Sequence, residues 1–170
     1  TDPTITLLNN NAPLIIPFGG SFTDPGYTTS DNSDDPVTVT VNGSVDTNVT
    51  ARYTITYTAS DGSFNTQTAT RTVFVGPQAI AGNDEAVCDN EDLNLGITVA
   101  DPSYSYQWTS APAIGSPFGP IIDSPTSAFT RVVPQVTTLF TLTVTTTIDG
   151  QNLVETDDVV ITVIENPEAS

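Results

Sequence analysis

Apolar and polar residues alternate with a period of two along most of this chain, and that period predicts β-strands. In the first half the clearest runs are residues 37–41 and 53–59, where Val, Tyr and Ile alternate with Thr. Four more strands are predicted there, at residues 4–8, 13–17, 27–30 and 69–75. Asparagines at positions 9–11 separate the first two as parts of one split strand. No window shows the period of an amphipathic helix, so the first half is predicted to be all-β.

The second half repeats the pattern after an interruption at Gly76-Pro77-Gln78. Residues 110–127, rich in Pro, Gly and Ser, are predicted to form a long loop, and the Asp149-Gly150 turn to close a terminal hairpin. Strands are predicted at residues 93–99, 104–108, 129–133, 139–147 and 153–164. Short strands at regular spacing between turn residues are typical of a β-sandwich. We therefore predict two domains, residues 1–77 and 78–165, followed by a linker at residues 166–170.

The charge balance narrows the function more than any motif does. Twenty acidic residues stand against three arginines, without Lys or His, and the net charge is -17. Such a chain repels nucleic acid and anionic membrane surfaces, and no apolar stretch approaches the ~18 residues of a membrane span. We therefore expect no nucleic-acid partner, no membrane insertion and an extracellular or cell-surface location. Thr1 is expected to begin a fragment of a longer polypeptide.

The available residue types exclude most catalytic chemistry. Histidine, the usual general base near neutral pH, is absent. Lysine, which Schiff-base chemistry and a Lys–Asn isopeptide bond both require, is absent as well. Of the remaining carboxylate pairs, Asp157 and Asp158 are adjacent on a strand and would point to opposite faces, while Asp34 and Asp35 lie in a turn without a predicted pocket. We therefore predict that the chain is not an enzyme.

Two stretches of sequence resemble known families. Residues 4–75 resemble a bacterial immunoglobulin-like (Ig-like) domain, related to HYR-type modules, that occurs in tandem on surface and secreted proteins. Residues 79–165 are similar to a more divergent PKD-like or Ig-like repeat, abundant in Bacteroidota adhesins. The stretches that carry the first resemblance are PTITLL, FTDPGYTTSDN, VTVTVNGSVDT and RYTITYTASDGSFNTQTATRTVFV; those that carry the second are AGNDEAVCDNEDLNL, YSYQWTS and TTLFTLTVTTTIDGQ. The resemblance implies two tandem Ig-like β-sandwiches in an extended arrangement, used as stalks, spacers or adhesive units.

Cys88 is the single cysteine of the chain. In the second family a Cys at this position often pairs with one just after the last hairpin turn. Here Gln151 follows Gly150, so the disulfide-braced version of the fold is ruled out. The neighbouring Asp89 and Glu91 disfavour a reactive thiolate. We therefore predict that Cys88 is unpaired and buried as a small hydrophobe.

Acidic residues gather in two loops that the predicted strand order places at one pole of the first domain. One is the run of residues 31–36, and the other is the Asp61-Gly62 turn. Calcium takes about six to eight oxygens from flexible loops, so one interpretation is a Ca²⁺ site formed by Asp31, Asp34, Asp35 and Asp61. The other is that Asp and Asn build solvated turns, and no EF-hand motif decides between them. A second Ca²⁺ site, between the domains, would draw on Asp24, Asp46, Asp101 and Asp149; the alternative there is a hydrated hinge.

Three aromatic residues, Tyr104, Tyr106 and Trp108, share one face of a predicted strand. Such a row can stack on sugar rings. However, an inward Trp on the third strand is the core residue of most Ig-like sandwiches, and we predict that role for Trp108. Phe118, in the long loop, is expected to be more exposed than any of the three.

These observations predict a non-catalytic extracellular stalk or spacer of a large bacterial surface adhesin or secreted multidomain protein. Its partners would be neighbouring Ig-like modules of the same chain, and calcium would stiffen it. The alternative is a carbohydrate-binding accessory module of a secreted polysaccharide-active protein. That module would bind an extracellular glycan through the loop at residues 110–127.

Overall fold

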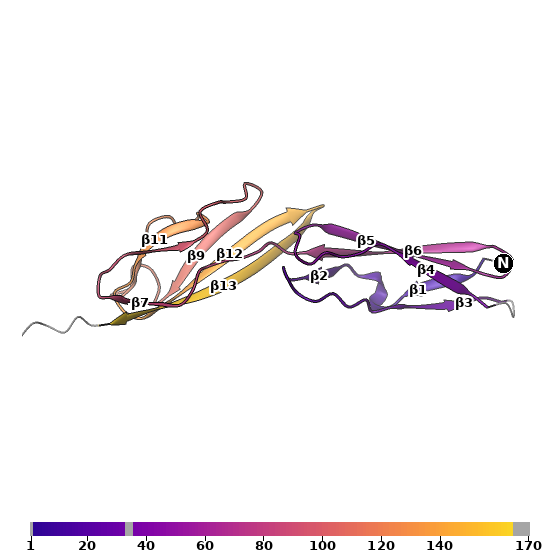
Figure 1. Cartoon of the computed structure of the whole chain (residues 1–170), viewed down its shortest axis with the longest axis horizontal. Helices are drawn as coiled ribbons and strands as arrows, with labels where there is room; N and C mark the ends of the chain where they lie inside the picture. Colours follow the sequence, from indigo (N-terminus) through magenta and orange to yellow (C-terminus); the bar gives the residue numbers. More distant parts are fainter. Residues whose placement is uncertain (1, 33–35, 165–170) are drawn as a thin grey trace, which may run out of the picture. The chain divides into compact units, whose positions relative to one another are not determined.

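The computed structural model describes residues 2–32 and 36–164. The chain forms two compact units, Thr1–Gly76 and Pro77–Ser170, and each strand pairs within its own unit (Figure 1). The described residues form strands and one short 3-10 helix, Asn9–Asn11, and contain no helix long and apolar enough to cross a membrane. The predicted all-β fold is confirmed. The predicted linker at residues 166–170 lies outside the described part of the chain.

The first unit packs a two-stranded sheet on a four-stranded sheet, in the orders β1-β3 and β2-β6-β5-β4. Leu7, Ile55, Tyr57 and Val73 are buried between them. The predicted split of the first strand is confirmed, because β1 pairs with β3 whereas β2 pairs with β6. The strands are β1 (Thr4–Leu7), β2 (Leu14–Ile16), β3 (Tyr27–Ser30), β4 (Thr38–Asn42), β5 (Arg52–Ser60) and β6 (Thr66–Val75).

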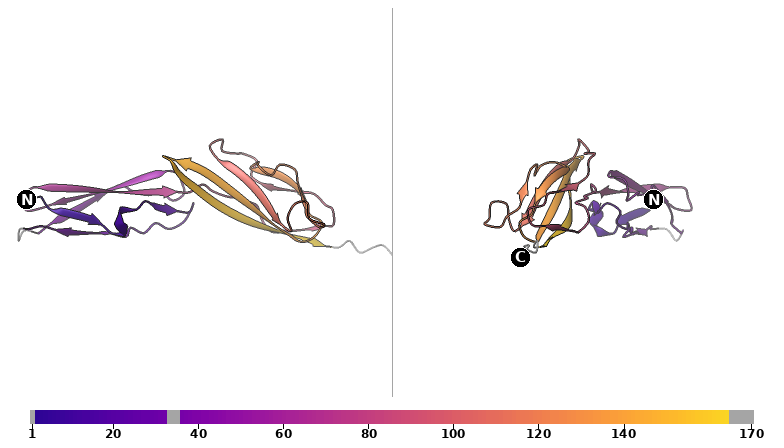
Figure 2. Two further views of the ribbon diagram at one scale, coloured as in Figure 1. Left: turned by 180° about the vertical axis from the view of Figure 1, so that it is seen from behind. Right: turned by 60° about the vertical axis from the view of Figure 1, so that its left-hand side comes forward.

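The second unit packs a three-stranded sheet, β10-β11-β8, on a four-stranded sheet, β7-β13-β12-β9. Its longest strands, β12 and β13, form the predicted terminal hairpin, orange to yellow in Figure 2. The Asp149-Gly150 turn has positive φ at both residues, as a type I′ hairpin turn requires. The strands are β7 (Glu85–Cys88), β8 (Leu93–Gly96), β9 (Ser105–Ala111), β10 (Ile121–Ile122), β11 (Phe129–Val133), β12 (Thr138–Ile148) and β13 (Gln151–Ile164).

Trp108 is at the centre of the second core. Its side chain is 1% exposed, and its indole N–H donates to the carbonyl of Ser127 at 2.9 Å. Gly96 makes room for the ring, since a Cβ there would lie 3.0 Å from Trp108 Cζ2 and 2.0 Å from the carbonyl oxygen of Ala128. The prediction that Trp108 is a core residue is therefore confirmed.

In each unit one early strand pairs in parallel with the last strand. Strand β2 pairs with β6, and β7 pairs with β13, whereas the other strand pairs are antiparallel. Two carboxylates continue the second pairing: Asp84 Oδ1 accepts from the Val160 N–H at 2.8 Å, and Asp157 Oδ2 accepts from the Ala81 N–H at 2.8 Å. Both bonds span 76 residues in sequence, which is also the offset of the β7–β13 ladder. Two carboxylate bonds therefore keep the offset of the ladder, whose strand pairing itself covers Glu85–Cys88.

Three local predictions are corrected by the structure. Strand β7 was not expected, because only Val87 in it is buried and the alternation is too short to detect. Residues 110–127 are not all loop, since β10 pairs there with β11. The strand predicted at residues 93–99 ends at Gly96, where φ is positive, and Val99 is exposed. Positive φ breaks the extended backbone that the apolar alternation alone suggested.

Candidate functional site

The loops predicted to bind calcium leave the same end of the first unit. The chain leaves β3 at Ser30 and enters β4 at Thr38, which pairs with Ser60, the last residue of β5. The turn that begins at Asp61 therefore lies at the pole of the loop after Ser30. Asp31 lies in that loop, and its carboxylate accepts from the Asn32 N–H at 2.6 Å. The predicted ligands Asp34 and Asp35 lie outside the described residues.

Asp61 is engaged within its own turn. Its Oδ1 accepts from the backbone N–H groups of Ser63 and Asn65, each at 2.9 Å, and its Oδ2 accepts from the Asn65 side-chain amide at 2.8 Å. The side-chain hydrogen bond from Asn65, with the two backbone bonds, holds the pKa of Asp61 below its ordinary value despite partial burial. No group of three acidic or cysteine side chains converges among the described residues. The Ca²⁺ site at this pole stays a prediction, and it depends on Asp34 and Asp35.

Two of the aspartates predicted for the second calcium site build turns. Asp46 Oδ1 accepts from the Asn48 N–H at 3.0 Å. Asp101 Oδ1 accepts from the Ser103 hydroxyl and N–H at 2.6 and 2.9 Å, and these bonds lower the pKa of Asp101. Both are the Asx-turn geometry in which an aspartate bonds the backbone two residues on. The calcium interpretation of these residues likewise stays a prediction.

Asp24 has a different role, because it is the partner of a buried arginine. The Arg71 side chain is 0% exposed, and its Nε lies 3.2 Å from Asp24 Oδ1 and donates to the Tyr57 hydroxyl at 3.2 Å. The other guanidinium nitrogens donate to the carbonyls of Leu8 and Gly26 at 3.1 and 2.9 Å. Leu8 follows β1 and Gly26 precedes β3, so Arg71 on β6 ties the small sheet of the first unit to the large one.

Tyr57 and Asp24 complete this Arg71 network. The Tyr57 hydroxyl donates to Asp24 Oδ2 at 2.5 Å, and the Gly26 N–H donates to Asp24 Oδ1 at 3.0 Å. Burial acts to raise the pKa of Asp24, but the bonds from Tyr57 and Gly26 and the charge of Arg71 outweigh it and lower that pKa. Burial and the bond to Asp24 raise the pKa of Tyr57. The network is therefore an ion pair whose charged groups are hydrogen-bonded within the first unit.

Sequence reasoning missed the Arg71 network, although the pattern contained its signal. Ala69, Arg71 and Val73 share one face of β6, so an arginine occupies an inward position of an alternating strand. A buried charge at such a position needs a partner, and the sequence supplies an aspartate in the FTDPGY stretch. That stretch and the one around Arg71 both belong to the residues that carry the resemblance of the first half.

The prediction that Cys88 is buried is wrong: the thiol is exposed. Because β7 lies at the edge of its sheet and Val87 points into the core, period two places Cys88 on the outer face. The backbone N–H of Cys88 donates to Glu91 Oε2 at 3.0 Å. The predicted exposure of Phe118, in contrast, is confirmed.

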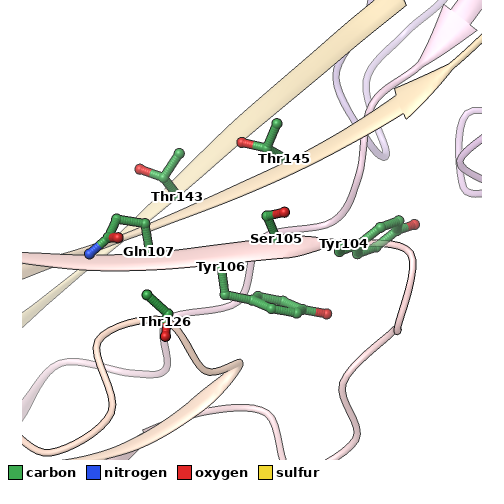
Figure 3. Close-up of a pocket in the computed structure, with 7 residues that line it drawn as sticks. All are labelled: Tyr104, Ser105, Tyr106, Gln107, Thr126, Thr143 and Thr145. Carbon is green, nitrogen blue, oxygen red and sulfur yellow. The ribbon is translucent and has the colours of Figure 1, made fainter. Parts of the chain in front are cut away.

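An open groove of about 510 Å³ follows β9 in the second unit (Figure 3). Figure 3 shows Ser105, Gln107, Thr143 and Thr145 on one side of the sheet, with Tyr106 and Thr126 on the other side of β9. Tyr104 stands where the strand begins. We call this cavity the β9 groove; it is lined by Tyr104, Ser105, Tyr106, Gln107, Thr126, Thr143 and Thr145.

Backbone and side-chain bonds fix the walls of the β9 groove. The Trp108 N–H donates to the Pro125 carbonyl at 2.7 Å and its indole to Ser127, so the segment that carries Thr126 is held against β9. The Tyr106 hydroxyl accepts from the Asp101 N–H at 2.9 Å. The Tyr104 ring, half-buried, lies 6.5 Å from that of Tyr106 with a tilt of 55°. The groove is therefore preformed.

Comparison with known proteins finds one family model that matches most of the first unit. Residues 5–75 match the family model of the bacterial surface protein, Ig-like domain, and the chain's fold is that of Ig-like β-sandwiches. No curated protein sequence matches the chain. The finer likeness of the two halves to HYR-type and PKD-like modules stays a prediction.

Solved structures similar to the chain come from Bacteroides thetaiotaomicron and Drosophila. A lipoprotein from Bacteroides thetaiotaomicron shares 22% identity over 84% of this chain, with a TM-score of 0.39. Drosophila N-cadherin EC1-3 shares 13% over 98%, with a TM-score of 0.35, and the chain covers 68% of it. A SusE-like surface-located polysaccharide-binding protein from Bacteroides thetaiotaomicron shares 12% over 98%, with a TM-score of 0.35, and the chain covers 35% of it. This chain spans 60% of the length of the lipoprotein.

Proposed function

We propose that the chain is a non-catalytic, load-bearing spacer of a bacterial surface or secreted multidomain protein. In this role each unit carries tension between neighbouring modules of the same polypeptide. The observation that carries the proposal is the parallel pairing of β2 with β6 and of β7 with β13. The match of residues 5–75 to a bacterial surface domain supports the location.

The pairing matters because of the direction in which tension acts. Pulling on the two ends of a unit draws its early strand toward the N-terminus and its last strand toward the C-terminus. For parallel neighbours these directions are opposite, so the strands must slide past each other. All the bonds of the ladder then resist together, because they lie across the direction of sliding. Strands pulled apart from the same end lose their bonds one at a time.

The use of the carboxylates supports a mechanical rather than a catalytic role. Asp61 and Asp101 cap turns, Asp24 pairs with Arg71, and Asp84 and Asp157 bond the backbone across the parallel pair. A general acid or base needs a carboxylate that faces a substrate pocket. These five side chains are engaged with the protein itself.

Force spectroscopy of the 170-residue chain, held at its two ends, tests the proposal. The units release different lengths of chain, so their unfolding events can be distinguished. We expect the double variant Asp84→Ala/Asp157→Ala to lower the unfolding force of the second unit and to leave that of the first unchanged. Asp158→Ala is the matched control, because Asp158 is exposed on the opposite face of β13. An unchanged force in the double variant would count against load-bearing by this pairing.

A further inference from the structure

The chemistry of the β9 groove differs from that of the rest of this acidic chain. Its seven lining residues are uncharged, although the chain carries a net charge of -17. The surface stays uncharged on the neighbouring strand β13, where Thr156 pairs with Thr143 and Val154 pairs with Thr145. A neutral ligand can therefore enter without a charge penalty, whereas an anionic one approaches a negative molecule.

The groove also offers unused hydrogen-bonding groups. Within the part of the chain that the structure describes, no hydrogen bond engages five hydroxyls of the groove, those of Tyr104, Ser105, Thr126, Thr143 and Thr145. Gln107 donates through Nε2 to the Trp108 carbonyl at 2.9 Å, which fixes its amide and leaves Oε1 as an acceptor. Elsewhere, threonine hydroxyls such as that of Thr146 bond the backbone. The groove therefore presents a row of donors and acceptors beside the rings of Tyr104 and Tyr106.

We propose that the β9 groove binds a short stretch of a neutral oligosaccharide. A sugar ring has an apolar face that can lie on the Tyr104 ring and a rim of hydroxyls that can bond Gln107, Thr143 and Thr145. Successive outward residues on a strand are about 6.8 Å apart and neighbouring strands about 4.8 Å apart. The two rows on β9 and β12 thus match one or two sugar rings.

A peptide strand is the alternative ligand, and the edge of β9 disfavours it. Strand addition requires free backbone groups along a sheet edge. The Trp108 N–H at that edge already donates to Pro125 at 2.7 Å. This site lies in the second unit and does not involve the parallel strand pairs. Oligosaccharide binding would therefore add to the spacer function, and a negative binding result would leave the spacer function untouched.

Affinity electrophoresis of the 170-residue chain tests the proposal. The gels contain a β-glucan, a xylan, a mannan or a galactan as neutral polysaccharides, and polygalacturonate as the anionic one. We expect at least one neutral polysaccharide to retard the chain and polygalacturonate not to do so. Retardation by none of the neutral polysaccharides overturns the proposal, and so does retardation by polygalacturonate alone.

Variants then locate the site. We expect Tyr104→Ala to weaken the retarding interaction about tenfold or more, and Thr143→Val/Thr145→Val to weaken it as well. The matched control is Thr54→Val/Thr56→Val, which removes two hydroxyls at the same spacing from the outer face of β5 in the first unit. Thermal unfolding of each variant shows whether it is folded. Equal binding by the groove variants and the control would place the interaction elsewhere and overturn the assignment.

Discussion

At the scale of single residues, we expect the Arg71 network to contribute strongly to the stability of the first unit. Removing one partner of a buried ion pair leaves an uncompensated charge in the interior. We expect Asp24→Asn to lower the free energy of unfolding of the first unit by about 3 kcal/mol. Trp108 is the single Trp of the chain and lies in the second unit, so its fluorescence should report no change there. Amide exchange of β5 and β6 measures the loss in the first unit.

The matched control for Asp24→Asn is a surface ion pair in the same chain. Arg131 Nε lies 2.8 Å from Asp92 Oδ2, and the two side chains are 46% and 54% exposed, against 0% and 31% for Arg71 and Asp24. Asp92→Asn should therefore lower the free energy of unfolding much less than Asp24→Asn does, because solvent screens the exposed pair. If Asp24→Asn and Asp92→Asn lower the free energy of unfolding equally, burial does not strengthen the contribution of the Arg71 ion pair.

The ion pair of Asp24 and Arg71 also sets how the stability of the first unit should respond to acid. The pKa of Asp24 is lower in the folded state than its ordinary value of 3.8, so the folded state favours the ionised form. Its stabilising effect is complete above that ordinary value and is lost as the pH falls through the lower folded value. The first unit of Asp24→Asn should consequently lose less stability than the wild type between neutral pH and about pH 2.

At the scale of strands, the alternation of apolar and polar residues was enough to predict most of the fold. It located the long strands β5, β6, β12 and β13, where several buried positions repeat, and it placed Trp108 in the core. It failed for β7 and β10, because a strand of four or two residues contains too few periods to be recognised. The burial of Cys88 was mispredicted for the same reason: without β7, nothing indicated which face Cys88 occupies.

The candidate sites depend on pairings that a single sequence does not contain. The β9 groove requires the register of β9 on β12 and the bond from Trp108 to Pro125. Thr143 and Thr145 were visible as outward threonines, but nothing in the sequence placed them beside Gln107. The carboxylate contacts of Asp84 and Asp157 likewise require the parallel pairing of distant segments, which neither spacing nor composition predicts.

At the scale of the whole molecule, the excess of negative charge remains the reason to test calcium. A cation that binds the folded state alone stabilises it by about 2.7 kcal/mol at one hundred times its dissociation constant. We expect millimolar Ca²⁺ to raise the melting temperature more than Mg²⁺ does, since Mg²⁺ demands stricter geometry. We expect Asp34→Asn/Asp35→Asn to lose that calcium-specific increment.

Sodium at matched ionic strength is the control for general screening in the calcium experiment. Asp61→Asn separates the two interpretations further. If the Asp61 carboxylate only caps its own turn, this variant lowers stability by the same amount with and without Ca²⁺, whereas a Ca²⁺ ligand at this position makes the loss larger with Ca²⁺. If sodium raises the melting temperature as much as Ca²⁺ does, or the double variant responds like the wild type, the loop aspartates are solvated turn residues.

The decisive test of load-bearing by the parallel strand pairs is to change the direction of pulling. With force applied at the two chain ends, β7 and β13 slide past each other. Moving the C-terminal attachment to Asn152, an exposed residue at the start of β13, pulls the same strands apart from one end. We expect the unfolding force of the second unit then to fall, while that of the first unit, loaded as before, is unchanged. An equal unfolding force in both geometries would contradict this expectation.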